Sequence, residues 1–311
     1  MRLRMNKNTD KYRYKIYGLN IESEIILPEL EVLDQGEPID VNISYGIMPS
    51  KIQSYIKKGK RNRYKKREMW FYIDKVANYL ITNGDSIIVE PDNNASDIEI
   101  KKFILGSCLG MALIQRQTVA IHGGTVVVNN KAIILTGNSG AGKSTLTAAF
   151  RLDGYKFLSD DVAATIVDLD NLEDILVCPG YPRQKLCIDA MNNMDYNAGD
   201  FTMIDETRNK YSIPTDESFV SNNIPLGAIV EINACACDCV EIEEVDGLDK
   251  IDLLMKNIYR IEITTKSGIY DKYLSKCINI AKKVPFYRLK RPIGKLSVKE
   301  QIDLINDVGV L

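Results

Sequence analysis

The sequence predicts an α/β protein, with a nucleotide-binding core of mixed sheet and flanking helices at residues 96–311 after a small strand-rich domain at residues 1–95. The core is predicted by a strand–loop–helix–strand unit, in which the apolar run 131–136 leads into a glycine-rich loop and then into good helix formers. The N-terminal domain is predicted by short runs with strand character between turn signals, of which Asn83-Gly84 is the strongest.

The glycine-rich loop reads Gly-Asn-Ser-Gly-Ala-Gly-Lys-Ser and fits the P-loop pattern G-x-x-x-x-G-K-[ST] without a mismatch. Glycines let several backbone N–H groups point at one phosphate, and the dipole of the following helix adds positive potential. Lys143 would reach the β- and γ-phosphates, and the Ser144 hydroxyl would bind Mg²⁺. The pattern predicts these nucleotide-binding residues: Gly137, Asn138, Ser139, Gly140, Ala141, Gly142, Lys143, Ser144 and Thr145.

Two adjacent carboxylates, Asp160 and Asp161, follow the second strand of this unit, Tyr155–Ser159. Carboxylates at the carboxyl end of a strand beside a phosphate loop suit Mg²⁺ coordination or proton abstraction. The sequence therefore predicts a catalytic or metal-binding role for the pair.

His122 is the only histidine of the chain, and it begins the segment that leads to the loop. The apolar run Thr125–Val128 and the run 131–136 are joined by Asn129-Asn130, which predicts a hairpin. A single histidine can be a structural residue or a catalytic one, and its place beside the loop keeps the catalytic interpretation open.

Together, His-Gly, a strand, the loop, a helix and Asp-Asp resemble the catalytic domain of the HPr kinase/phosphorylase family and its wider relatives, most closely over residues 118–165. Weaker similarity continues through three later segments, 178–186, 224–230 and 284–289. The N-terminal stretch 17–30 resembles the small first region of kinases from peptide-biosynthesis clusters, including lasso-peptide kinases.

This resemblance implies an ATP- and Mg²⁺-dependent kinase that transfers the γ-phosphoryl group to a serine hydroxyl. By analogy, Lys143 stabilises the transferred phosphate, Asp161 accepts the serine proton, and Asp160 assists or binds Mg²⁺ with Ser144. His122 would orient the two aspartates, whose roles could also be exchanged.

The chain departs from the family in the segment after the aspartates, where HPr kinases carry an acidic metal ligand. Here that stretch contains Arg183 and Lys185, two basic residues that would share one face of a strand and contact substrate or phosphate. Lys210 is a further candidate, and a solvated basic face is the alternative for all three. The chain also lacks an Arg-Pro-Gly-Arg-like loop, which favours a one-way kinase acting on a serine other than that of HPr.

Composition is that of an ordinary globular protein, with 45% hydrophobic and 26% charged residues and a formal net charge of −2. This balance predicts no nucleic-acid or membrane partner, and a start without an apolar signal core predicts a cytoplasmic enzyme. Seven cysteines argue against a disulfide scaffold. Cys235, Cys237 and Cys239 alternate, which on a strand would place three thiols on one face; small buried residues are favoured over a metal site.

Other segments carry weaker expectations. Residues 52–67 include a basic run that suits either an acidic or phosphate-bearing partner or, as the favoured alternative, a solvated loop or hairpin tip. Residues 98–116 are predicted as a long helix. The polar region 205–225 is expected to form a loop that could close over substrate. The N-terminal strands are expected at Tyr14–Tyr17, Glu24–Leu27, Val41–Tyr45, Met69–Asp74, Tyr79–Thr82 and Ser86–Glu90.

The leading functional hypothesis is a serine kinase whose acceptor is a peptide or protein, such as a ribosomally made precursor peptide of the lasso type. The alternatives are a small-molecule kinase acting on free serine or a similar metabolite, and a non-catalytic nucleotide-binding sensor. The resemblance also implies ATP rather than GTP as the phosphate donor, and allows a homo-oligomer of the kind that relatives form.

Overall fold

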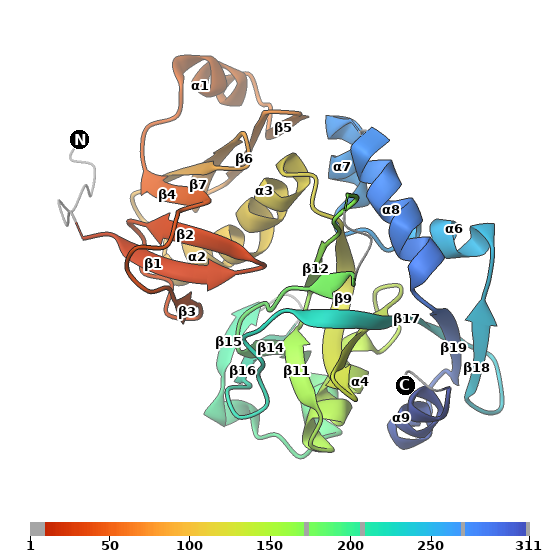
Figure 1. Ribbon diagram of the computed structural model, residues 1–311. Helices are drawn as coiled ribbons and strands as arrows, with labels where there is room; N and C mark the ends of the chain where they lie inside the picture. The colour runs from red at the N-terminus through yellow and green to blue at the C-terminus, as the bar shows by residue number, and fades with distance from the viewer. Residues whose placement is uncertain (1–9, 171–173, 206–208, 269–270, 309–311) are drawn as a thin grey trace. The chain divides into compact units, whose positions relative to one another are not determined.

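The computed structural model describes residues 10–170, 174–205, 209–268 and 271–308. The protein is mixed α/β, with large mixed sheets and helices, and its chain divides into two compact units (Figure 1). The first unit runs to Thr118 and also takes in a segment that begins at Glu262, and the second unit begins at Val119. None of the helices in the described part of the chain has the length and apolar character needed to span a bilayer.

The first unit contains one sheet, which runs in the order β3-β1-β2-β4-β8-β7-β6-β5 among the described residues. Its strands are β1 (Tyr12–Ile16), β2 (Leu19–Ser23), β3 (Glu31–Val32), β4 (Val41–Tyr45), β5 (Asn62–Lys65), β6 (Glu68–Ile73), β7 (Ala77–Thr82) and β8 (Ser86–Pro91). The β7–β8 hairpin predicted from Asn83-Gly84 is confirmed, and both turn residues have positive φ. The strand expected at Glu24–Leu27 is wrong, because the chain pairs one segment earlier, as β2.

The basic stretch of residues 52–67 includes the solvated hairpin tip that the sequence predicted, at the exposed turn of residues 66–67, together with part of a helix. It begins within helix α1 (Ser50–Lys57), continues as β5, and ends in the turn to β6. Ile52 of α1 is buried in a cluster with Trp70 and Leu80, so an apolar stripe fixes this helix to the sheet. The abundance of lysine and arginine hides that stripe in the sequence.

The helix predicted over 98–116 is confirmed, although it is interrupted: α2 (Asp97–Phe103) passes through a π-helical turn, η1 (Ile104–Cys108), into α3 (Leu109–Gln115). It belongs to the first unit rather than to the second, in which the sequence predicts it. The Tyr79 hydroxyl donates to the carbonyl of Ile100 at 3.2 Å, and the rings of Phe71 and Phe103 lie 6.3 Å apart. The first boundary between the compact units along the chain therefore falls after Thr118, not near residue 95.

The second unit is built on a mixed sheet in which β11, β9, β10, β17, β19 and β18 are neighbours in that order. β10–β17 and β17–β19 are parallel pairs and the others are antiparallel, while β12 and β13 bridge β9 back to β17. The strands are β9 (Ala120–Val128), β10 (Lys131–Thr136), β11 (Lys156–Ser159), β12 (Val162–Ile166), β13 (Leu176–Val177), β17 (Ile224–Cys235), β18 (Glu241–Val245) and β19 (Phe286–Pro292).

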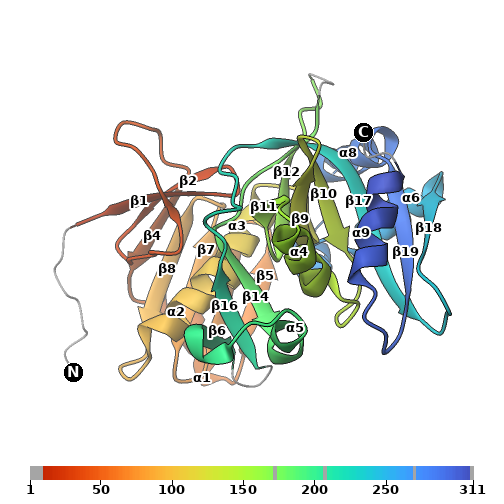
Figure 2. The ribbon, with the colours of Figure 1, turned by 90° about the horizontal axis from the view of Figure 1, so that it is seen from below.

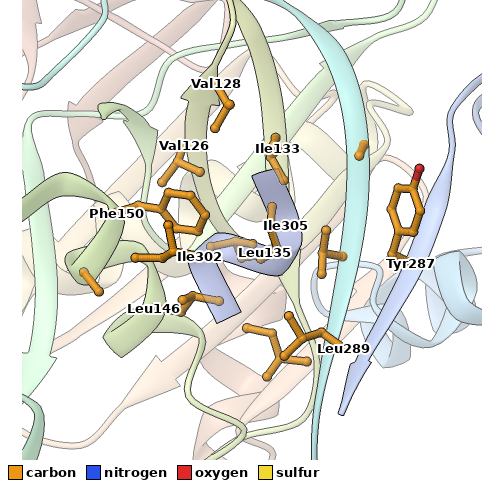
Figure 3. Close-up of a cluster of buried hydrophobic side chains, with 14 of the residues drawn as sticks. Val126, Val128, Ile133, Leu135, Leu146, Phe150, Tyr287, Leu289, Ile302 and Ile305 are labelled. Carbon is orange, nitrogen blue, oxygen red and sulfur yellow. The ribbon is translucent and has the colours of Figure 1, made fainter. Parts of the chain in front are cut away.

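Helices α4 (Lys143–Leu152) and α9 (Val298–Asp307) cover one face of this sheet, as Figure 2 shows. Their side chains Leu146, Phe150, Ile302 and Ile305 join apolar residues of four strands in one buried cluster (Figure 3). This cluster fixes the start of α4 against the end of β10, so the loop between them is anchored at both ends.

The remaining described elements of the second unit include a small sheet in the order β14-β16-β15. The bounds are β14 (Arg183–Cys187), α5 (Ile188–Asn192), the 3₁₀ turn η2 (Ala198–Asp200), β15 (Thr202–Asp205), β16 (Lys210–Pro214), α6 (Leu248–Lys256) and α8 (Asp271–Lys283). Helix α7 (Ile261–Ser267) starts at the division between the units. Part of the region expected to be a polar loop, 205–225, is thus the strand β16; residues 206–208 of that prediction lie outside the described residues.

The hairpin predicted at Asn129-Asn130 is confirmed, with φ of 49° and 60° at the two turn residues and Val128 paired with Lys131. The prediction that three alternating thiols share a strand face is wrong, because β17 ends at Cys235. Cys237 and Cys239 lie beyond it, in irregular backbone.

Candidate active site

The glycine-rich loop 137–142 connects β10 to α4, and its glycines are required by backbone geometry. Gly137, Gly140 and Gly142 have φ of 132°, 82° and 104°, a region that other residues rarely adopt. A Cβ on Gly137 would lie 2.4 Å from the carbonyl oxygen of Ile232 on β17. The loop therefore folds against the neighbouring parallel strand in a conformation that only glycine permits.

Lys143, the first residue of α4, turns back onto the loop. Its Nζ donates to the carbonyl oxygens of Gly137 at 2.8 Å and Asn138 at 3.0 Å. Burial lowers the pKa of Lys143, and the nearby Asp161 carboxylate counteracts that shift. The ammonium thus lies inside the loop, where an anion bound by the loop would meet it.

The other predicted loop residues differ in their exposure to solvent. Asn138, Ser139 and Gly140 are exposed, whereas Ser144 and Thr145 lie half-buried in the first turn of α4. The backbone N–H groups of this first turn have no earlier helical carbonyl to bond and are available to an anion.

Arg291, at the end of β19, is a site residue that the sequence did not indicate. Its Nε donates to the carbonyl of Ala141 at 2.7 Å, and Nη2 lies 3.4 Å from the carbonyl oxygen of Gly140. The guanidinium also lies against Gly142, 3.2 Å from the position of an added Cβ. No local motif marks this arginine, because it reaches the loop only through the parallel pairing of β19 with β17 and of β17 with β10.

Two further glycines follow His122 on β9 and allow close packing beside the loop. A Cβ on Gly123 would lie 2.4 Å from the backbone oxygen of Leu135, and one on Gly124 would lie 2.2 Å from Oγ1 of Thr147 on α4. The His-Gly-Gly sequence is therefore continuous strand, pressed between the hairpin partner and the helix.

Asp160 follows β11, with its carboxylate turned into the protein. Its Oδ2 accepts a hydrogen bond from the backbone N–H of Lys185 at 3.0 Å, while Oδ1 is buried and has no hydrogen-bond partner among the described residues. Burial, followed by the charge of Asp161, raises the pKa of Asp160 to about 7. A buried carboxylate oxygen without a partner is costly unless a cation or a proton occupies it.

The pKa of Asp161 is shifted in the opposite direction, toward the ionised form. Burial opposes its ionisation, but the Nζ of Lys185 lies 3.1 Å from Oδ2, and this charge together with that of His122 lowers the pKa of Asp161 below its usual range. The Asp161 side chain keeps 43% of its surface exposed, so it is open to a reactant.

His122 lies beside Asp161, on β9. Its Nδ1 is 3.1 Å from the backbone oxygen of Asp161 and 3.7 Å from the carboxylate Oδ1. Burial lowers the pKa of His122, although Asp161 raises it. The ring also contacts Tyr259, with centroids 6.1 Å apart, so the imidazole is positioned from two sides.

The predicted residues Arg183 and Lys185 do lie on one face of a strand, β14, because the buried Gln184 between them faces the other way. Gln184 Nε2 donates to the carbonyl of Ser144 at 2.9 Å and so fixes β14 to the first turn of α4. Lys210 lies on the adjacent strand β16, where it pairs with Cys187 of β14. Its charge lowers the pKa of Asp160 and of Asp161. Within the described residues neither Arg183 nor Lys210 forms an ion pair.

Of the two predicted Mg²⁺ ligands, Asp160 has an atom that fits a magnesium ion, and Ser144 is half-buried in the first turn of α4. Magnesium commonly takes only one or two carboxylates from the protein, with substrate phosphates and water completing its shell. The partnerless Oδ1 of Asp160 provides an oxygen of this kind. No cluster of three His, Cys, Asp or Glu side chains suited to a metal occurs in the described part of the chain. Of the three alternating thiols, those of Cys235 and Cys237 lie 2.8 Å apart.

The fold and the site define a mixed α/β protein in which a glycine-rich loop at the end of a strand faces two adjacent carboxylates. No family model and no curated protein matches the chain. Among solved structures it is similar to the Hpr(Ser) kinase/phosphatase from Coxiella burnetii. That similarity has 12% sequence identity and a TM-score of 0.31, and it covers 61% of this chain and 95% of the other.

Proposed function

We propose that the protein is an ATP-dependent P-loop kinase that transfers the γ-phosphoryl group to a serine hydroxyl of a peptide or protein. The observation that carries this proposal is the pair of aspartates whose carboxylates are held in different states beside Lys143. Asp160 has a buried oxygen that lacks a partner among the described residues, whereas Asp161 keeps 43% of its side-chain surface exposed and has a lowered pKa that favours its ionised form. Phosphoryl transfer needs these two functions together, a metal ligand and an acceptor for the hydroxyl proton.

The triphosphate would bind with its oxygens at the loop N–H groups, and Lys143 would leave the loop carbonyls to pair with the β- and γ-phosphates. The serine oxygen attacks the γ-phosphorus, the bond to the bridging oxygen breaks, ADP leaves, and Asp161 takes the hydroxyl proton. Mg²⁺ held by Asp160 and Ser144 would neutralise charge on the phosphates. His122 positions Asp161 through its contacts with the backbone oxygen and the carboxylate of that residue.

Asp161 is better placed than Asp160 to accept the proton, because its side chain is partly exposed and its lowered pKa keeps it ionised. Lys185 lowers its basicity through the 3.1 Å contact. A bound γ-phosphate would compete for the same ammonium, and the basicity of Asp161 would then rise in the complex with substrate. Arg183 lies on the same face of β14 as Lys185, and the charge of Lys210 acts on both aspartates; we assign these two side chains contacts with the phosphate or the acceptor.

A peptide or protein acceptor, such as a ribosomally made precursor of the lasso type, is supported by the resemblance of the sequence to peptide-biosynthesis kinases. The test is intact-mass analysis of candidate precursor peptides, incubated with the protein, ATP and Mg²⁺ in parallel with free serine. Addition of a phosphate to the peptide, localised to serine and absent when Asp161 is replaced by asparagine, supports the proposal. Phosphorylation of free serine alone would replace it with a small-molecule kinase, and nucleotide binding without transfer would leave a sensor.

A further inference from the structure

A cavity of about 320 Å³ opens on the side of the glycine-rich loop that the catalytic groups do not occupy. It is lined by Gly142 and Thr145 of the loop and α4, by Asn193 after α5, and by residues of the segment 291–301. Asp160, Asp161, His122 and Lys143 are not among its lining residues. We propose that this cavity binds the nucleoside part of a nucleoside triphosphate, an inference that rests on the proposed function.

The direction of a bound triphosphate follows from the order of groups along the loop. In a loop of this type the lysine meets the β- and γ-phosphates, and the backbone N–H groups hold the α- and β-phosphates. Lys143 is close enough to Asp160 and Asp161 for their charges to raise its pKa, so the γ end points toward the carboxylates. Thr145, two residues further along α4, lies instead at the cavity. The α end therefore leads into the cavity.

The size and the lining of the cavity suit a nucleoside. Its volume falls at the lower end of the roughly 300–1,000 Å³ of ligand pockets, too small for a whole nucleotide with its phosphates but adequate for a sugar and a base. Leu296 and Val298 provide apolar surface, and Asn193 provides an amide with donors and an acceptor. Gln301, a buried residue of the cavity lining, donates to Oγ of Ser297 at 3.1 Å. This hydrogen bond fixes the start of α9, which bounds the cavity.

Arg291 joins the cavity to the phosphate loop. The same guanidinium lines the cavity and is bonded to the carbonyl oxygens of Ala141 and Gly140. Its planar cation lies where the α-phosphate would enter, or where a base could stack on it. The loop and the cavity are thus one continuous site, with Arg291 between its phosphate and nucleoside parts.

The test compares two ligands, ATP and inorganic tripolyphosphate, by calorimetry on the full chain. Tripolyphosphate can occupy the loop but has nothing to place in the cavity. Leu296→Ala and Asn193→Ala, combined, are expected to raise the Kd for ATP by about tenfold or more, since apolar burial and a hydrogen bond are lost, and to leave the Kd for tripolyphosphate unchanged. Neighbouring residues outside the cavity provide the matched control, Ile293→Ala combined with Asn192→Ala.

The outcomes separate this inference from the proposed function. Selective loss of ATP affinity in the cavity variant, with the control unchanged, supports the nucleoside site. If tripolyphosphate binds and the cavity variant binds ATP as tightly as the wild type, the cavity assignment is overturned while the phosphate loop stands. Equal weakening of both ligands also overturns it, because the substitutions then act through the loop. If the wild type binds neither ligand, the proposed function falls and the inference falls with it.

Discussion

Lys185 contacts both aspartates: its side-chain Nζ lies 3.1 Å from Oδ2 of Asp161, and its backbone N–H donates to Oδ2 of Asp160 at 3.0 Å. One residue of β14 thus contacts both carboxylates, through different groups. The backbone contact holds the orientation of Asp160, whereas the side-chain contact sets the charge state of Asp161. These two effects can be separated by substitution, because only the side chain changes.

Replacement of Lys185 by methionine removes the ammonium and keeps the backbone N–H. Burial then acts on Asp161 with less opposition, so the pKa of Asp161 is expected to rise. If Asp161 is the base, the acidic limb of the pH profile of kcat/KM moves to higher pH in this variant. The profile should be measured from about pH 3 to pH 9, a window that brackets the ordinary carboxylate and imidazole values.

Lys185→Arg is the matched control, since it keeps the positive charge, and its acidic limb should stay near that of the wild type. The same charge pair predicts a stability effect. A lowered pKa in the folded state stabilises the protein above the unfolded-state value of about 3.9, and this contribution is lost as pH falls through the folded-state value. The difference in unfolding free energy between the wild type and Lys185→Met should therefore shrink in acid. An unchanged acidic limb in Lys185→Met would remove Asp161 from the role of base.

The two aspartates should fail in different ways when each is made an amide. Asp161→Asn is expected to lower the rate of transfer by about 10²-fold or more, as for loss of a general base, with little change in ATP affinity. Asp160→Asn is expected to raise the Mg²⁺ concentration for half-maximal activity by roughly 10–100-fold. Mg²⁺ titrations of single-turnover rates measure both. If the two phenotypes are exchanged, so are the roles, an alternative that the sequence also allowed.

Lys143→Ala should weaken ATP and inorganic tripolyphosphate alike, since this side chain would serve the phosphates and not the nucleoside. We expect the transfer rate to fall by about 10²–10³-fold, the cost of removing one preorganised charge from a transition state. Lys156→Ala, which changes an exposed lysine on β11, is the control and should bind both ligands normally. Retention of tripolyphosphate affinity in Lys143→Ala would show that the loop is not the phosphate site.

Local signals in the sequence predicted the β9–β10 hairpin, the strand–loop–helix unit and the aspartates after β11. Each depends on neighbours in the chain, such as the Asn129-Asn130 turn or the glycines before Lys143. The alternation of Arg183 and Lys185 on one face was likewise local, because it needs only a strand.

The parts that escaped prediction depend on long-range pairing. Arg291 reaches the loop because β17 lies between β10 and β19, and no pattern near residue 291 encodes that order. The hydrogen bond from Gln184 to the carbonyl of Ser144 requires β14 to pack on α4. The polar residues of β14 give no sign in the sequence that this strand packs against a helix. The place of the 97–115 helix was mistaken because its apolar face could have served either unit, and packing beside Tyr79 decides it.

The glycines of β9 offer a stability test with an internal control. Gly124→Ala should destabilise the protein by about 1–3 kcal/mol, since the new Cβ would meet the Thr147 side chain at 2.2 Å. Adding Thr147→Ala should restore part of that loss, because Oγ1 and Cγ2 are removed and only a 3.1 Å approach to Cβ remains. Gly123→Ala should be destabilising to a similar degree and gain nothing from Thr147→Ala, because its clash is with the backbone oxygen of Leu135. Urea unfolding of the five proteins measures these differences. Equal rescue of both glycine variants would contradict the packing of α4 on β9 described above.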